Sequence, residues 1–282
     1  MNIAMHLNLG SRTLDLGSPQ VMGVLNITPD SFSDGGHLAT VDDAVEAARS
    51  MVEAGASIID IGGESTRPGA SGVPEQEQLD RVMPVIEAVR RECEVIVSID
   101  TGNPAVILAA TTAGADIVND IFALTQPGAL AAVAATDVAV CIMHMQGVPA
   151  TMQDNPVYAA LPGDVIEFLR RRIAACQDAG IGAERLIIDP GFGFGKTHEQ
   201  NLVLLATLGQ FGALGRPILV GLSRKGTLGH LTGRAVDERL AAGLAAAVLA
   251  VERGANIVRT HDVPATVDAL KIAWAVMQQE QS

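Results

Sequence analysis

Short apolar runs that end in an acidic side chain recur along this chain, and they restrict its fold more than any other feature. One run ends at Asp189, where Pro190 and the glycine-rich residues 191–195 cannot extend a strand. A strand buried in a parallel sheet reads as continuous apolar sequence, so we expect Asp189 where such a strand becomes a loop. The same pattern recurs at residues 58–60, 97–100 and 117–120. The repetition predicts parallel strands whose carboxyl ends form one active rim.

Alanine-rich helical segments alternate with strand-like runs along most of the chain. We expect strands at residues 21–25, 57–61, 95–99, 115–118, 138–142, 185–188, 217–220 and 255–259. We expect helices near residues 41–54, 75–91, 104–113, 127–135, 162–179, 199–208, 237–253 and 263–279. Eight strands that are each followed by a helix predict an α/β fold, a (β/α)8 TIM barrel rather than a doubly wound sheet. Gly55, Gly114 and Gly254 each precede a strand, as helix-ending glycines do.

Residues 1–20 differ from this alternation. They carry alternating leucines around residues 10–12, which predicts a short N-terminal hairpin that plugs one end of the fold. Residues 21–282 show no composition shift or linker, so we expect a single catalytic barrel domain there. A chain of 282 residues with 48% hydrophobic residues can bury a core of that size.

The composition argues against several classes of function. A formal net charge of −13 without a basic patch argues against nucleic-acid binding, so any anion must be caught locally. Cys93, Cys141 and Cys176 form no C-x-x-C pair, which favours reduced thiols over a disulfide or a zinc site. Residues 1–10 lack the features of a signal peptide, and the longest apolar stretch, residues 240–251, is too short to span a bilayer. We therefore expect a soluble, cytoplasmic protein without a membrane partner.

Two long connections follow the first two expected strands, at residues 26–36 and 62–72. Both exceed the usual length of a connection from a strand to a helix, which favours lids over passive turns. Asn26 opens the first of them. Its amide oxygen is a candidate ligand for Mg²⁺ if a substrate diphosphate supplies the other oxygens, and it is an equally good candidate for capping the loop.

Cations follow the last two expected strands of this acidic chain. Arg224 and Lys225 follow the seventh, and Arg259 and His261 share one side of the extended segment at the eighth. The loops after strands seven and eight of such barrels often bind anions, so we expect a phosphate or pyrophosphate there. Residues 191–197 do not form a P-loop, because three residues separate Gly191 from Gly195 where the motif needs four. Those glycines serve either a tight strand exit or a direct phosphate contact.

Three acceptor side chains, Asp100, Asn119 and Asp189, are expected to converge on the same rim. A carboxylate accepts two hydrogen bonds side by side. That property suits a ligand edge with adjacent N–H groups, such as the edge of an aminopyrimidinone.

At these residues the chain resembles the dihydropteroate synthase family, over residues 21–276. The blocks that follow the family pattern, in order, are residues 23–36, 62–69, 98–101, 119–121, 143–147, 189–196, 223–225 and 259–263. One departure is Gly226, where the family commonly has a bulkier or polar residue. The resemblance implies a pterin-binding barrel that acts in folate biosynthesis, is a target of sulfonamides, uses Mg²⁺ and forms a homodimer, for which residues 240–251 and a neighbouring helix are the expected interface.

The resemblance also assigns roles to individual residues at matching positions. The residues implied to hold the pterin are Asp100, Asn119, Ile121, Met143, Asp189 and Lys225. The residues implied to bind pyrophosphate are Arg67, Arg259 and His261, with Asn26 as the Mg²⁺ ligand. The residues implied to flank p-aminobenzoate are Phe32, Thr66, Pro68, Ser223 and Arg224. Asp100, Lys225, Arg259 and His261 are the implied catalytic residues.

The implied reaction joins p-aminobenzoate to 6-hydroxymethyl-7,8-dihydropterin diphosphate and yields 7,8-dihydropteroate and pyrophosphate. Two alternatives stay open. A pterin-dependent methyltransferase shares this kind of barrel but needs neither the anion sites nor the two long loops. A catalytically silent paralogue would bind pterin or partners only.

Overall fold

A computed structural model of the chain describes residues 6–27, 40–65 and 72–280. Its central strands are β3 (Gln20–Asn26), β4 (Ile58–Gly62), β5 (Ile96–Asp100), β6 (Ile117–Asp120), β7 (Ala139–Met143), β8 (Leu186–Asp189), β9 (Leu219–Gly221) and β10 (Ile257–Thr260). Its helices are α2 (Val41–Glu53), α3 (Glu75–Glu92), α4 (Pro104–Thr112), α5 (Ala129–Ala134), α6 (Gly163–Asp178), α7 (His198–Ala206), α8 (Gly226–Thr232), α9 (Leu240–Glu252) and α10 (Val263–Glu280). Short 3-10 turns lie at η1 (Ala183–Arg185), η2 (Leu208–Leu214) and η3 (Val236–Glu238).

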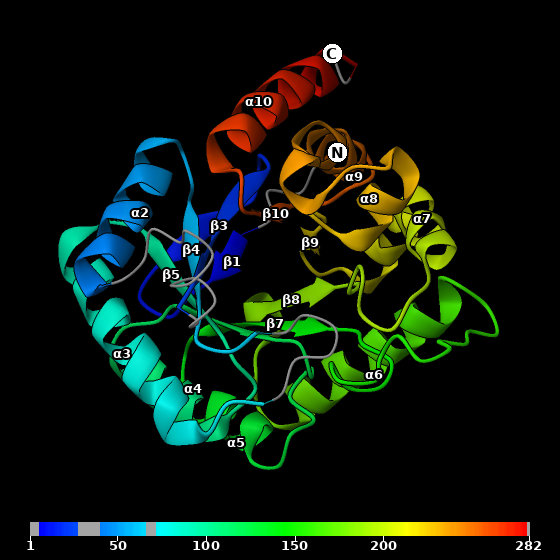
Figure 1. Cartoon of the computed structure of the whole chain (residues 1–282). Coiled ribbons are helices and arrows are strands. Elements are labelled where there is room, and N and C mark those ends of the chain that lie inside the picture. The colour runs from blue at the N-terminus through cyan, green and yellow to red at the C-terminus, as the bar shows by residue number, and fades with distance from the viewer. Residues whose placement is uncertain (1–5, 28–39, 66–71, 281–282) are drawn as a thin grey trace.

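The eight central strands form a parallel sheet in the order β8-β7-β6-β5-β4-β3-β10-β9. An isolated parallel bridge between Ile188 and Ile218 joins the two edges of the sheet, beside a hydrogen bond of 2.9 Å from Ile188 N to Pro217 O. The helices surround this nearly closed ring in Figure 1. The predicted (β/α)8 barrel is confirmed.

The boundaries differ from the predicted ones in a few places. Most strands begin and end one or two residues later than expected, so Asp100, Asp120 and Asp189 are the last residues of their strands rather than residues just beyond them. The helix α8 was not predicted, because residues 226–232 contain two glycines and two threonines and read as a loop. The expected helix at residues 237–253 starts later, as α9.

Alternate strand residues face opposite sides of the barrel wall. One buried cluster packs the outer face of the strands against the helices and includes Ile59, Val97 and Val118. A second cluster, which includes Ile58 and Ile117, fills the inside of the barrel near the amino ends of the strands. Further along β4, β5, β6 and β8 the inward positions become polar, at Asp60, Ser98, Asn119 and Asp189, which places acidic side chains toward the carboxyl end.

The N-terminal hairpin closes the amino end of the barrel, as predicted. It pairs β1 (His6–Asn8) with β2 (Thr13–Asp15) in antiparallel fashion. Its four leucines are buried in the inner cluster and lie at positions 7, 9, 14 and 16. Arg12 fastens the turn to the barrel with a hydrogen bond of 3.3 Å from Nη1 to Val95 O.

Local signals at the helix ends agree with the sequence. Thr40 and Thr197 cap α2 and α7 in capping boxes with Asp43 and Gln200. The three glycines predicted to end helices before strands all have a left-handed φ, between +98° and +105°. Within the described ranges, no helix has the length and hydropathy needed to cross a membrane.

Candidate active site

Arg259 links two buried carboxylates at the carboxyl end of the barrel. It lies on β10, and its Nε donates to Asp60 Oδ2 at 2.6 Å while Nη2 donates to Asp100 Oδ2 at 3.0 Å. Asp60 belongs to the deeper layer of the barrel and Asp100 to the layer above it, because the strand register pairs Asp60 with Ser98 and Gly62 with Asp100. Arg259 therefore contacts acids in two layers of the barrel. Its positive charge can also attract an anionic ligand.

Asp60 is the centre of a hydrogen-bond network that the sequence did not assign to the site. Its fully buried side chain accepts from Ser98 Oγ at 2.6 Å and from Asn119 Nδ2 at 3.1 Å, in addition to Arg259. The apolar run ends at Asp60, but the strand was expected to reach residue 61, and β4 continues to Gly62. The period of two from Asp60 to Gly62 was the available signal, since it puts Asp60 on the inner face.

Burial shifts the pKa values of two acids of this site toward neutral pH. It raises the pKa of Asp100 to about 7, against the lowering effect of Arg259. Burial also raises the pKa of Asp189 to about 6, although a hydrogen bond from Gly191 N and the charges of nearby lysines favour its ionised form. A ligand that brings positive charge or N–H donors would therefore stabilise the ionised form of both carboxylates.

Lys225 approaches the same acids from the loop after β9. Its Nζ lies 4.2 Å from the centre of the Phe194 ring, a cation–π contact. Burial, and then the charge of Arg259, lower the pKa of Lys225 to about 8. The negative charges of Asp189 and Asp100 oppose this shift.

The glycine-rich loop is held from inside by Lys196. Lys196 Nζ donates to the carbonyl oxygens of Gly191 at 2.8 Å and Phe194 at 2.9 Å, and it lies 3.0 Å from His144 Nδ1. A Cβ on Gly191, which has φ +73°, would lie 1.8 Å from His144 O, so the backbones approach too closely for any side chain. The lysine therefore supports the strand exit and is itself buried, which agrees with the rejection of a P-loop.

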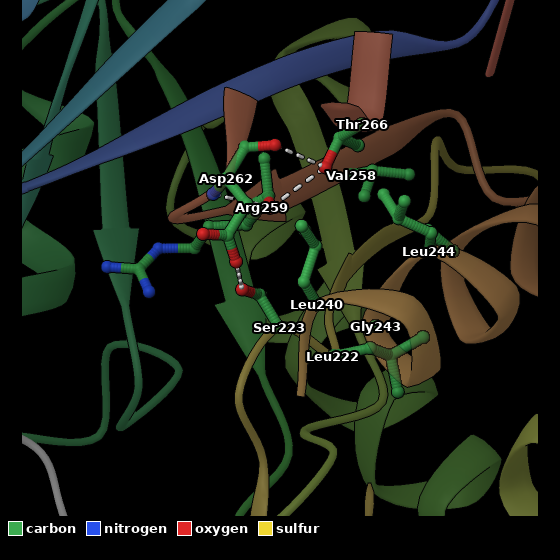
Figure 2. A pocket seen from close by; sticks show the side chains of 11 residues that line it. Leu222, Ser223, Leu240, Gly243, Leu244, Val258, Arg259, Asp262 and Thr266 are labelled. Atoms are coloured by element: carbon green, nitrogen blue, oxygen red, sulfur yellow. Dashed lines mark hydrogen bonds between the residues drawn. The ribbon is translucent and has the colours of Figure 1, made fainter. Parts of the chain in front are cut away.

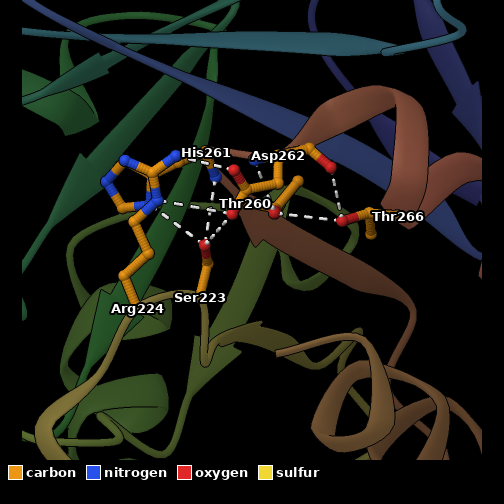
Figure 3. A network of polar contacts seen from close by, with 6 residues as sticks. All are labelled: Ser223, Arg224, Thr260, His261, Asp262 and Thr266. Carbon is orange, nitrogen blue, oxygen red and sulfur yellow. Dashed lines mark hydrogen bonds and ion pairs between the residues drawn. The ribbon is translucent and has the colours of Figure 1, made fainter. Parts of the chain in front are cut away.

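Ser223, Arg224, His261 and Asp262 form one network beside Arg259, shown in Figure 3. Ser223 Oγ accepts from His261 N at 3.3 Å, lies 3.1 Å from His261 Nδ1 and donates to Asp262 Oδ2 at 3.4 Å. Arg224 Nη2 donates to Asp262 Oδ1 at 2.6 Å. Burial, and then the charge of Arg259, lower the pKa of His261 to about 3, so its imidazole is neutral at pH 7.

A small cavity between β9, β10 and α9 lies behind this network, as Figure 2 shows. The guanidinium of Arg259 points away from the leucines that line it, Leu240 and Leu244. The cavity has a volume of about 10 Å³, near the lower limit for one water molecule. It is a packing gap and cannot hold a substrate.

The remaining predicted pterin residues also lie at this end of the barrel. Asn119 and Met143 face inward from β6 and β7, both almost fully buried, and Ile121 follows β6 with 7% of its surface exposed. Asp120 faces the other side of the wall and accepts from Phe122 N at 2.8 Å and Leu124 N at 2.7 Å. It caps a turn and does not belong to the site.

Asn26, at the end of β3, lies beside Asp100 across Gly62. A Cβ on Gly62 would be 3.4 Å from Asn26 Oδ1 and 3.8 Å from Asp100 Oδ2, so the missing side chain leaves room between two oxygen donors. Hard cations prefer such oxygens. Within the described residues, no three His, Cys, Asp or Glu side chains converge to hold a metal without further ligands.

Four predicted site residues, Phe32, Thr66, Arg67 and Pro68, lie outside the described residues. The other predicted residues all come together at the carboxyl end of the barrel. Fold and site together define an α/β-barrel enzyme whose rim combines buried acids, which suit a nitrogen-rich ring, with cations, which suit an anion.

Comparisons with known proteins agree with this class. The model of the family described as "Pterin binding enzyme" matches residues 22–261. The dihydropteroate synthase of Escherichia coli K12 is 49% identical over 270 residues, which cover 96% of each chain. The Yersinia pestis dihydropteroate synthase, solved as a sulfonamide drug complex, superposes with a TM-score of 0.94 at 49% identity and covers 97% of this chain and 100% of that one. The Xanthomonas albilineans dihydropteroate synthase, solved with 4-aminobenzoic acid, superposes with a TM-score of 0.91 at 50% identity and covers 97% of this chain and 98% of that one.

The chain therefore belongs to the family of pterin binding enzymes, and within it to the dihydropteroate synthases. The resemblance in its sequence motifs is confirmed over nearly the whole length.

Proposed function

We propose that this chain joins the amine of p-aminobenzoate to the methylene carbon of 6-hydroxymethyl-7,8-dihydropterin diphosphate. The new C–N bond replaces the C–O bond to the diphosphate, which leaves as pyrophosphate, and the amine loses one proton. The observation that carries the proposal is the bridge from Arg259 to Asp60 and Asp100, because it places the cation for a leaving anion beside the acids for a heterocycle. The 49% identity to a dihydropteroate synthase along 96% of the chain supports it.

The pterin ring is assigned to the acids in the barrel and their neighbours. Asp189 accepts hydrogen bonds from the edge of the ring, and Asn119 can both accept and donate there. Lys225 donates to oxygen or nitrogen acceptors of the ring. Ile121 and Met143 supply the apolar walls. Asp100 stabilises the positive charge that spreads over the pterin when the diphosphate leaves, and a preorganised charge of this kind is usually the largest catalytic contribution.

The diphosphate is assigned to Arg259 and His261, together with Arg67. The neutral His261 donates one hydrogen bond, which leaves the two arginines as the permanent charges. Asn26 is the proposed protein ligand of Mg²⁺, with diphosphate oxygens completing its coordination. When bound, Mg²⁺ would neutralise charge on the leaving group.

The p-aminobenzoate is assigned to Ser223 and Arg224, with Phe32, Thr66 and Pro68 on the two long loops. Ser223 and Arg224 now bond to His261 and Asp262, so a bound carboxylate would exchange one set of acceptors for another. Such an exchange costs little in hydrogen bonding because Arg224 keeps a charged acceptor. The relative solved with 4-aminobenzoic acid supports this substrate class.

One assay tests the reaction and its alternatives. Purified chain, the pterin diphosphate, p-aminobenzoate and Mg²⁺ are incubated, and dihydropteroate and pyrophosphate are quantified. We expect the two products in equal amounts. Ligand binding without product would indicate a silent paralogue, and methyl transfer from a methylated folate donor without dihydropteroate would indicate a methyltransferase.

Metal removal tests the role of Asn26. Treatment with EDTA should abolish product formation, and added Mg²⁺ should restore it. Asn26→Ala should raise the Mg²⁺ concentration needed for half-maximal rate while leaving the affinity for the pterin without its diphosphate unchanged. Full activity in EDTA would remove Asn26 from this role.

We also propose that the protein is a cytoplasmic homodimer. Its three cysteines are buried free thiols, which suits a reducing compartment. The neighbouring helices α9 and α10 carry exposed apolar side chains, Leu240, Leu249, Ile272 and Val276, which a second copy could cover.

A further inference from the structure

The loop that carries Lys225 has an unfavourable backbone. Arg224 has φ +59°, in the left-handed region that residues with a side chain rarely adopt. Within the loop itself, the turn is closed by a hydrogen bond of 3.3 Å from Lys225 N to Leu222 O. A backbone of this kind persists when the surrounding structure restrains it. Since Lys225 follows directly, the restraint also sets the position of its amine.

Arg239, just before α9, restrains this backbone from outside the loop. Its Nη1 donates to Arg224 O at 3.0 Å and lies 3.4 Å from Lys225 O, while its Nε donates to Arg234 O at 3.1 Å. The guanidinium therefore joins the loop after β9 to the segment that follows α8. A lysine could not copy this geometry, because its single amine lacks the planar set of donors.

The guanidinium of Arg239 packs against α8 at Gly229. A Cβ on Gly229 would lie 2.2 Å from Arg239 Nη2 and 2.4 Å from its Cζ, so the planar group lies against helix backbone that has no side chain. Gly229 is itself buried. A glycine inside a helix is normally unfavourable, and here it makes room for the arginine.

We propose that Arg239 is a positioning residue of this enzyme: it holds the backbone of Arg224 and Lys225 so that the amine of Lys225 reaches the pterin. The inference rests on the pterin role of Lys225 in the proposed function. Arg239 acts through Lys225 and does not touch the substrate. Asp262 holds the Arg224 side chain, so backbone and side chain of the loop are fixed separately.

Two variants remove the restraint in different ways. Arg239→Ala deletes the guanidinium, and Gly229→Ala displaces it while making the helix sequence more favourable. We expect both to raise KM for the pterin diphosphate by about tenfold to a hundredfold, as small misplacements of a binding group do. Arg253→Gln is the control, because the Arg253 side chain donates to Leu249 O and pairs with Glu252 at the C-terminal end of α9, away from the loop that carries Lys225. Its KM should match the wild type.

Three readouts separate positioning from general damage. The melting temperature of Gly229→Ala should equal or exceed that of the wild type while its KM rises. Guanidinium ions at millimolar concentration should partly restore Arg239→Ala, and urea at the same concentration should not. In a Lys225→Met background, Arg239→Ala should cause less than about a twofold further change in KM, because residues that act through one group are not additive.

A wild-type KM in Gly229→Ala and Arg239→Ala, beside a raised KM in Lys225→Met, would overturn this inference alone. A wild-type KM in Lys225→Met would overturn the proposed role of Lys225 and the inference with it. If Arg239→Ala does not fold, the KM of the folded Gly229→Ala decides. Independent, additive effects of Arg239 and Lys225 would also contradict the inference.

Discussion

Single side chains in this site have protonation equilibria near neutral pH, and burial is the cause in each case. Asp100 and Lys225 have pKa values of about 7 and about 8, so both can change charge in the working range. His261 has a pKa of about 3 and does not. The proposed mechanism needs Asp100 and Asp189 as carboxylates and Lys225 as an ammonium.

The pH dependence of kcat/KM for the pterin diphosphate should therefore be bell-shaped. It should rise with pH as Asp100 loses its proton near pH 7 and fall as Lys225 loses its proton near pH 8. Asp100→Asn should move the acidic limb toward the pKa of Asp189, about 6. Lys225→Met should remove the alkaline limb, and His261→Ala should preserve both. An alkaline limb that persists in Lys225→Met would contradict the assignment.

The sequence predicted residues that directly follow an apolar run better than residues inside one. Asp189 and Arg259 were predicted at the rim because they stand at the ends of apolar runs, and Lys225 because it lies in the short loop that follows one. Asp60 was not assigned, because it lies inside its strand, two residues before the end, where a side chain can face either side of the barrel wall. The partners of Lys196 were also not predicted, since its hydrogen bonds connect His144, just after β7, with the loop after β8, and these segments are far apart in the sequence.

At the scale of elements, the hairpin β1–β2 has a packing role that its short sequence already indicated. Its leucines are part of the same cluster as the inward residues of the barrel strands. The hairpin therefore completes the barrel core from the end opposite the active site.

Truncation of a hairpin leucine should lower stability and leave catalysis intact. Leu7 is fully buried, so Leu7→Ala should cost about 2–4 kcal/mol of unfolding free energy, measured by urea denaturation. The kcat of the folded variant should equal that of the wild type, because the site lies at the other end. Leu108→Ala on α4, where the side chain is 45% exposed, should have little effect on stability. Equal losses of unfolding free energy in the two variants would contradict the packing role of the hairpin.

The helix α8 shows where sequence patterns fail at this scale. Gly226 and Gly229 weaken its helical signal, yet Gly229 is the position against which Arg239 packs. The requirement comes from a residue ten positions later in the chain, and no local pattern contains it. The strands and the other helices were predictable because their signals are local.

For the whole molecule, the exposed apolar side chains of α9 and α10 are the part of the described surface that we assign to a second copy. Ile272 and Val276, on α10, are 69% and 57% exposed. The double variant Ile272→Glu, Val276→Glu should be a monomer by light scattering at a concentration where the wild type is a dimer. Leu108→Glu, on α4, should remain a dimer. A wild-type mass that is already monomeric would contradict the proposed homodimer.

In the proposed function, one end of the barrel holds a pterin through acids and its diphosphate through Arg259 and His261. The most direct measurement is the dissociation constant of 6-hydroxymethylpterin and of its diphosphate, by calorimetry, in two variants. Asp189→Asn should weaken both ligands by a similar factor. His261→Ala should weaken only the diphosphate, by about tenfold or more, as loss of a hydrogen bond to a charged group does. If His261→Ala lowers the affinity for both ligands equally, or Asp189→Asn lowers the affinity for neither, the assignment of the acids to the pterin and of Arg259 and His261 to the diphosphate is contradicted.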